Sequence, residues 1–154
     1  MKTKRNKHQV LTKFGEILFE EYEFQNEWIA KIPDDNYEIS FIIENKIDWD
    51  LIKQIVEELI DKKKNLTEIA ESVLIPFYKS IFNNEYQERE GYFELICIEI
   101  KKYDGNYENF KCEINLCFAI HSKTNFVMDP YATYSCTFLK EYYNYVLAKV
   151  EREI

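Results

Sequence analysis

The chain has 154 residues, close to the commonest size of a single domain and enough to bury a core of its own. It contains only three glycines and two histidines but 12 tyrosines and 11 phenylalanines. Nucleotide-dependent chemistry is disfavoured, because Gly15, Gly91 and Gly105 stand alone rather than in a phosphate-binding motif. No apolar run approaches the roughly 18 residues that cross a bilayer, so we expect no membrane span.

Charge is unevenly distributed along the chain, whose formal net charge is −8. Five basic residues precede Gly15 with no acid among them: Lys2, Lys4, Arg5, Lys7 and Lys13. We expect residues 1–13 to be a flexible basic arm and residues 14–154 to be a single α+β domain. The acidic domain should repel nucleic acid and anionic lipid and attract a basic partner.

Residues 16–44 show the alternation of apolar side chains that is typical of strands. Apolar residues occupy even positions from Trp28 to Ile32 and odd positions from Tyr37 to Ile43, with a turn signal at residues 33–36. This pattern predicts an antiparallel hairpin. A further strand is expected from Ile17 to Phe24.

A helical period follows, with apolar residues at Trp49, Ile52, Val56, Leu59 and Ile60 and with Asp48 placed to cap the first turn. We interpret the charged residues 61–64 as a break. A second apolar stripe then begins after Asn65, where Glu68 completes a capping-box pattern. Pro76 predicts a kink or an early end. These two helices should pack as an antiparallel hairpin.

The period returns to two from Tyr92 onward. One hairpin is predicted with a turn at residues 104–106, followed by strands over residues 132–139 and 142–151. The last segment also fits a helix, but its β-branched residues and tyrosines favour a strand. The predicted fold is therefore α+β, a twisted antiparallel sheet packed against a central two-helix hairpin.

The four cysteines, Cys97, Cys112, Cys117 and Cys136, lie in strand-like segments. No apolar export segment follows the basic N-terminus, so we expect reduced thiols and a cytoplasmic protein. A zinc site is disfavoured, because strand alternation places Cys112 on the face opposite to Cys117 and His121. We expect no metal or cofactor, and a protein that is not an enzyme. A small hydrolase or transferase that uses Cys117 or Cys136 with His121 and Asp129 remains an alternative.

Three short segments suggest a family resemblance: Phe14-Gly15-Glu16-Ile17, Glu27-Trp28 and the strand entry from Asp129 to Tyr134. In this layout the chain resembles small bacterial proteins that recur as immunity proteins in polymorphic-toxin loci. The resemblance implies an intracellular protein that binds and neutralises a cognate toxin, in many cases a nuclease with a basic cleft. A DNA-mimic inhibitor of a nucleic-acid enzyme would share the same acidic character and is a second alternative.

An acidic, aromatic-containing surface would suit such binding, with acids speeding association and aromatic anchors slowing dissociation. Trp28 is a candidate for the core as well as for the surface, and a tyrosine-bearing sheet edge would also suit a homodimer. The predicted partner-binding residues are Glu20, Glu21, Glu23, Asp34 and Asp35 as steering charges, with Trp28, Tyr131 and Tyr134 as anchors.

Overall fold

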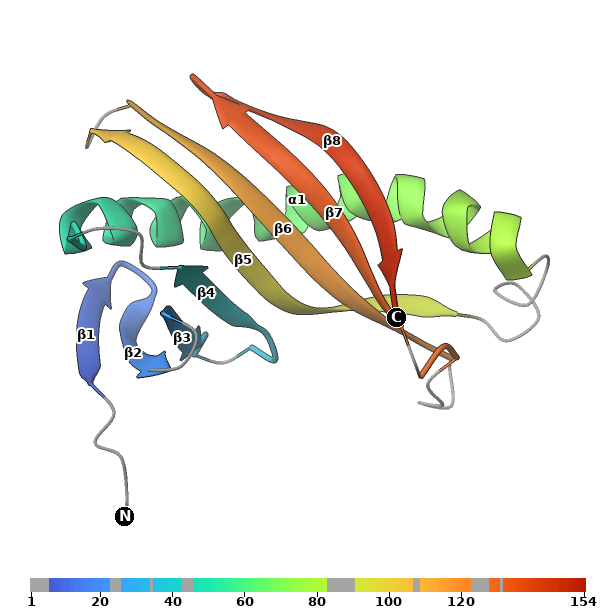
Figure 1. Cartoon of the computed structure of the whole chain (residues 1–154), viewed down its shortest axis with the longest axis horizontal. Coiled ribbons are helices and arrows are strands. Elements are labelled where there is room, and N and C mark those ends of the chain that lie inside the picture. Colours follow the sequence, from blue (N-terminus) through green and yellow to red (C-terminus); the bar gives the residue numbers. More distant parts are fainter. Residues whose placement is uncertain are drawn as a thin grey trace, which may run out of the picture.

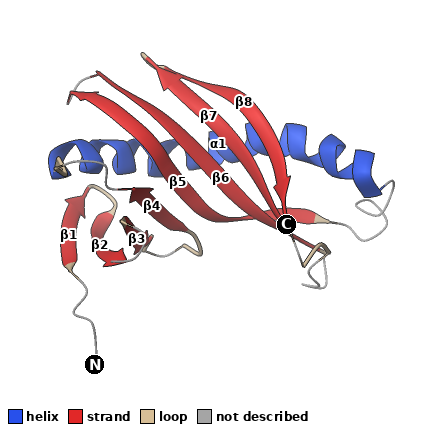
Figure 2. Ribbon diagram, in the orientation of Figure 1, coloured by secondary structure: helices blue, strands red, loops and turns tan. Residues whose placement is uncertain are grey.

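The computed structural model describes residues 6–22, 26–33, 35–42, 46–82, 91–106, 109–122, 128–130 and 132–154. Within these residues, eight strands form one sheet whose spatial order follows the sequence, and one long helix crosses one face of it (Figures 1 and 2). The elements are β1 (Lys7–Thr12), β2 (Gly15–Tyr22), β3 (Glu27–Lys31), β4 (Glu38–Ile42), α1 (Trp49–Phe82), β5 (Tyr92–Asn106), β6 (Asn109–His121), β7 (Thr133–Glu141) and β8 (Asn144–Glu153).

The sheet consists of two antiparallel meanders, β1–β4 and β5–β8, joined by a parallel pairing of β4 with β5. A parallel pair needs a long crossover connection, and α1 lies between these two strands in the chain. The predicted hairpins β3–β4 and β5–β6 are confirmed, as is the strand character of β8. The turn expected at residues 104–106 is misplaced, because these residues belong to β5 and pair with β6. The expectation of a wholly antiparallel sheet is wrong at the β4–β5 joint.

The predicted two-helix hairpin is also wrong, because α1 is a single helix of 34 residues. Its buried stripe continues from Leu59 to Leu66, seven residues or about two turns later, so the two predicted stripes are one. The charged residues between them belong to the helix. Lys62 pairs with Glu58 one turn earlier, and the ammonium of Lys63 lies 3.0 Å from the carboxylate of Asp35. Lysine is a good helix former, so a charged exposed turn does not break a helix.

Pro76 lies inside α1, which continues to Phe82, so the expected early end does not occur. Proline has no N–H group to bond the carbonyl of Ser72, one turn earlier. Ser72 is exposed, and its carbonyl can be hydrated instead. The helix therefore tolerates Pro76 because the missing bond is on its solvent side.

Residues 7–12, expected in a flexible arm, instead form the edge strand β1. Val10 and Thr12 are buried on the side of the sheet that faces α1, and the ring of His8 stacks on Trp49 with centroids 3.7 Å apart. The alternation of buried and exposed residues in this segment is short, and its basic residues made it resemble a solvated tail.

The hydrophobic core fills the space between α1 and one face of the sheet. At one end, Trp49 of α1 contacts the rings of Phe19, Trp28 and Phe41, with centroids 5.1–5.9 Å apart. In the middle, Ile55 and Leu59 of α1 are fully buried, as are Ile114 and Leu116 of β6. No other helix or strand of the described residues covers the opposite face of the sheet. We call that opposite face the outer face.

A proline at position 64 distinguishes one continuous helix from two helices joined by a loop. Lys64 is exposed in the middle of α1. We expect Lys64→Pro to lower the free energy of unfolding by about 3 kcal/mol or more, because it removes one helical hydrogen bond and clashes with the preceding turn. Lys64→Ala, the matched control, should change it by less than about 0.5 kcal/mol. Equal stabilities in urea unfolding would indicate a loop at residues 61–64.

Candidate functional site

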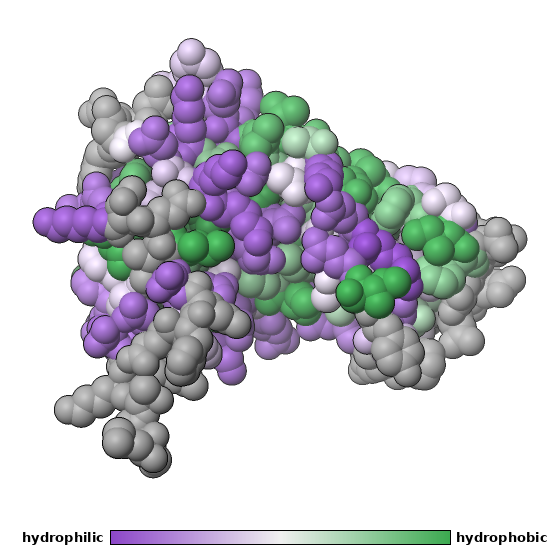
Figure 3. Space-filling view, in the orientation of Figure 1, coloured by the Kyte–Doolittle hydropathy of each residue, from purple (hydrophilic) through white to green (hydrophobic). Residues whose placement is uncertain are grey.

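The register of the strands places the residues of the outer face in continuous rows across the sheet. One row crosses all eight strands through directly opposite residues: Lys7, Glu20, Ile29, Ser40, Glu99, Asn115, Thr137 and Lys149. Neighbouring rows are also rich in charge, and Figure 3 shows a mainly hydrophilic surface interrupted by hydrophobic areas. Carboxylates outnumber lysines on this face: Glu16, Glu20, Glu27, Glu38, Glu94, Glu99, Asp104, Glu113, Glu141, Glu151 and Glu153, against Lys7, Lys31, Lys101, Lys102, Lys111 and Lys149.

Glu99 lies at the centre of the outer face, on β5. Its carboxylate accepts a hydrogen bond from the Cys117 thiol, with Sγ and Oε1 2.9 Å apart, and pairs with the Lys101 ammonium at 2.8 Å. Burial alone would raise the pKa of Glu99, but these hydrogen bonds from Cys117 and Lys101 outweigh it and lower the pKa. Glu99 is therefore ionised at neutral pH, a partly buried negative charge in the middle of the face.

Small polar side chains surround Glu99 and are closely packed. Ser40 and Ser135 are only 2% and 3% exposed, although they point away from the core. The Ser40 hydroxyl lies 3.8 Å from the Cys97 sulfur, and the Thr137 hydroxyl donates to the Asn115 amide oxygen at 2.9 Å. The centre of the outer face is thus polar and well ordered by its own hydrogen bonds.

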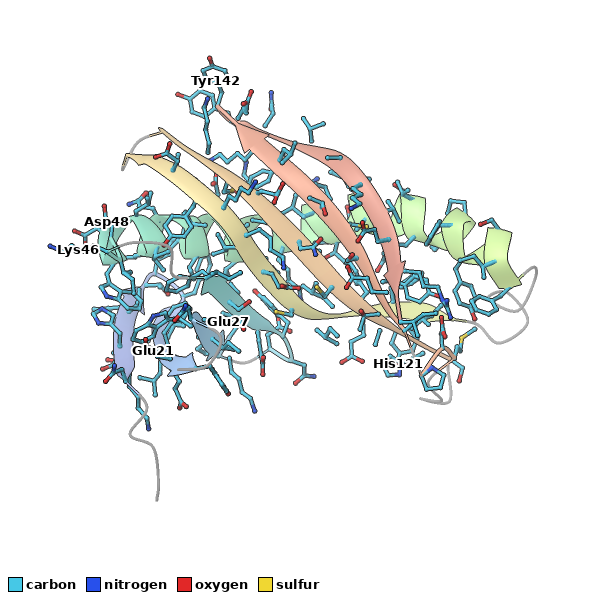
Figure 4. The ribbon with its side chains drawn as sticks, in the orientation of Figure 1. Glu21, Glu27, Lys46, Asp48, His121 and Tyr142 are labelled. Atoms are coloured by element: carbon cyan, nitrogen blue, oxygen red, sulfur yellow. The ribbon has the colours of Figure 1, made fainter. Side chains whose placement is uncertain are left out.

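Exposed apolar side chains flank this polar centre at both ends of the sheet. Leu11 and Leu18 of β1 and β2 are 66% and 44% exposed. At the other end, Leu139 and Val146 of β7 and β8 help to line a groove of about 730 Å³ between the ends of the β5–β6 and β7–β8 hairpins. Tyr142, at the tip of the β7–β8 hairpin, projects away from the molecule (Figure 4). Such side chains offer contact area to a partner.

The two described residues that we predicted as aromatic anchors are core residues instead. Trp28 is 7% exposed and packs edge-on against Trp49, and Tyr134 is completely buried. The Tyr134 hydroxyl donates to the Asp129 carboxylate at 2.5 Å. A partner cannot reach either ring while the domain is folded. The third predicted anchor, Tyr131, lies outside the described residues.

The predicted steering charges do not share one surface. Glu20 lies on the outer face, 4.0 Å from the Lys7 ammonium. Glu21, labelled on β2 in Figure 4, lies opposite the buried Trp28 and therefore on the helix side, and it accepts a hydrogen bond from Asn6. Asp35, beyond β3, pairs with Lys63 of α1. Glu23 and Asp34 lie outside the described residues. Among the predicted residues that the structure describes, only Glu20 belongs to the outer face.

The residues of the alternative Cys/His site have other partners. The His121 Nε2 atom lies 2.8 Å from the Glu94 carboxylate, at the end of β6 (Figure 4). Cys136 is fully buried in the core, where a substrate cannot reach it in the folded domain, and burial raises the pKa of its thiol to about 12. Asp129 is engaged by Arg152 and Tyr134. Within the part of the chain that the structure describes, no three His, Cys, Asp or Glu residues form a group that could hold a metal ion.

Cys97 and Glu99 were not among the predicted site residues, and a β-bulge beside them determines which residues share their face. Phe93 and Leu95 point into the core, and simple alternation would send Cys97 there as well. The register shifts by one residue between Leu95 and Cys97, so Ile98 and Ile100 enter the core and Cys97 and Glu99 face outward. The alternation of isoleucines at 96, 98 and 100 does predict that Cys97 and Glu99 face outward, but it gives no sign of the bulge, which leaves Ile96 out of the core.

Comparison of the chain with protein-family models, with curated proteins and with solved structures gives no significant match. Across the described residues, no helix combines the length and the apolar character needed to span a membrane.

The structural role of Asp129 predicts a pH dependence. Its carboxylate accepts two hydrogen bonds from Arg152, at 2.8 and 3.1 Å, which together with the Tyr134 hydroxyl lower its pKa. A lowered pKa contributes stability above the unfolded value of about 4, and this contribution is lost as pH falls through the folded value. We expect Asp129→Asn to lower the unfolding free energy by about 1.5–3 kcal/mol at pH 7, and by less below about pH 4.

The control for this measurement is Glu141→Gln, which removes an exposed carboxylate 3.8 Å from Lys111. Exposed pairs contribute little, so this variant should follow the wild-type profile within about 0.5 kcal/mol. Urea unfolding monitored from pH 2 to pH 8 makes the comparison. A constant difference between Asp129→Asn and wild type at every pH would contradict the proposed role of the ionised carboxylate.

Proposed function

We propose that the chain is an intracellular immunity-type protein that binds and neutralises a cognate toxin domain through the outer face of its sheet. The observation that carries the proposal is the excess of carboxylates over lysines on this face, in a chain whose net charge is −8. A partner with a basic cleft, such as a nuclease domain, has complementary charge.

The arrangement of the face suits such a partner. Seven inter-strand spacings of about 4.8 Å make the sheet about 34 Å wide along its surface, which accommodates the roughly 800 Å² per partner of a standard interface. The charged rows would accelerate encounter, while Leu18 at one end and Leu139 and Val146 at the other would exclude water from the bound complex. The rigid hydrogen-bonded centre around Glu99 means that little side-chain ordering is needed on binding.

Two charge reversals test whether the outer face binds. Glu20 and Glu113 lie on this face, on strands β2 and β6. We expect Glu20→Lys and Glu113→Lys each to weaken binding of the toxin domain encoded by the adjacent gene by about tenfold, mainly by slowing association. Isothermal titration with a catalytically inactive form of that domain, at two salt concentrations, measures the effect. Added salt should weaken wild-type binding as well.

The matched control is Glu68→Lys, the same charge change on the exposed side of α1. Because it alters the net charge equally but leaves the outer face intact, it should change the affinity far less. Binding that falls equally in all three variants would indicate a net-charge effect without a defined interface. An absence of binding by folded wild-type protein would refute the cognate-toxin proposal.

A further inference from the structure

Two of the four thiols lie directly opposite one another at the centre of the outer face. Cys97 of β5 and Cys117 of β6 are paired residues on adjacent antiparallel strands, and both are half-buried free cysteines. The other two thiols lack such a neighbour, since Cys112 lies opposite Tyr103 and Lys140, and Cys136 lies opposite Leu116 and Val150. Two facing thiols can react with each other, which neither thiol can do alone.

The bulge in β5 creates this pair. Leu95 lies opposite Phe118, and an unbroken register would place Cys97 opposite Leu116, inside the core. The extra residue at the bulge shifts β5 by one position, so that Cys97 lies opposite Cys117 on the outer face. The same shift exposes the pair to solvent-borne reagents on the face that no described helix covers.

The backbone geometry permits a bond between the two sulfurs. Directly opposite residues of an antiparallel pair have Cα atoms about 4.5 or 5.5 Å apart, within the roughly 4.4–6.8 Å that a disulfide spans. Their Cβ atoms, about 4.5–5.5 Å apart, are at or beyond the upper end of the disulfide range of about 3.5–4.5 Å. A bond formed here is therefore strained and readily reduced.

We propose that Cys97 and Cys117 form a reversible oxidation site, a dithiol that closes to a cross-strand disulfide with small-molecule disulfides such as oxidised glutathione. One protein thiol loses its proton to solvent and attacks the glutathione disulfide, which releases a first glutathione thiolate and leaves a mixed disulfide. The second protein thiol then also loses its proton to solvent, attacks the mixed disulfide and releases a second glutathione thiolate. Both thiolates take up a proton, so the protein loses two hydrogens and one glutathione disulfide becomes two glutathione thiols.

The surroundings of the pair indicate a slow reaction. The Cys117 thiol donates its hydrogen bond to the ionised Glu99, an arrangement that favours the protonated sulfur. Burial raises the pKa of Cys97 to about 12, so the thiolate that attacks a disulfide is scarce at neutral pH. Exchange should accordingly take minutes to hours, and the site is best tested at equilibrium. The inference concerns the chemistry of the thiols and does not depend on the proposed toxin binding.

To test the proposal, the folded full chain is incubated to equilibrium in buffers with increasing ratios of oxidised to reduced glutathione. After acid quenching and unfolding, remaining thiols are alkylated and counted by intact mass, and disulfides are located by peptide mapping. We expect two of the four thiols to be lost, with Cys97 linked to Cys117, and dithiothreitol to restore all four. Four alkylated thiols at every ratio, or a disulfide that joins two chains or any other pair, would overturn the proposal.

Single-cysteine variants provide the controls. Cys97→Ser and Cys117→Ser should form no intramolecular disulfide, although each can still carry one glutathione as a mixed disulfide. Cys112→Ala, which removes a core thiol, should still lose two of its three remaining thiols. Peptide mapping on the wild-type protein needs no substitution. The test therefore remains decisive even if a variant fails to fold.

Discussion

The burial of one face of the sheet by a single helix is the constraint on which the rest of the structure depends. A helix of 34 residues is about 51 Å long, more than the roughly 34 Å width of eight strands, so α1 can cross the sheet and contact both edge strands. It also makes the crossover that the parallel β4–β5 pair requires. The two meanders therefore share one core under α1 as well as one sheet through the β4–β5 pair.

In this arrangement the two faces of the sheet carry different kinds of side chain. Aromatic and aliphatic side chains meet α1 on one side, whereas carboxylates, small hydroxyl residues and two thiols occupy the other. Polar groups at the centre of the outer face are satisfied by one another, as Glu99 is by Cys117 and Lys101. A sheet with one apolar and one hydrogen-bonded polar face can leave the second face open to solvent or to a partner.

The strands could be predicted from the sequence because a period of two is strong in the segments that build β3 to β8. Strand order could not, since nothing local in β4 and β5 specifies that they pair in parallel. The prediction of two helices is wrong because the charged residues 61–64 were interpreted as a loop. Charged residues are typical of the exposed side of a helix as well as of a loop. Among the predicted binding residues, Glu20 lies on the outer face, and its role in binding stays a prediction, whereas Trp28 and Tyr134 are buried in the core because of their large apolar area. The alternation of Ile98 and Ile100 predicts that Cys97 and Glu99 face outward, but the pairing of Cys97 with Cys117 depends on a bulge that leaves no local signal.

The edges of the sheet are less suited to association than its outer face. β8 carries Lys149, Glu151, Arg152 and Glu153 in succession around Val150, and its pairing with β7 is interrupted by a register shift at Thr137. Charged residues and bulges on an edge strand oppose edge-to-edge pairing, so a homodimer through β8 is disfavoured. At the other edge, β1 has only six residues, which limits the hydrogen bonds that an added strand could gain. With both edges unfavourable to pairing, the acidic outer face is the surface through which the proposed partner binding would occur.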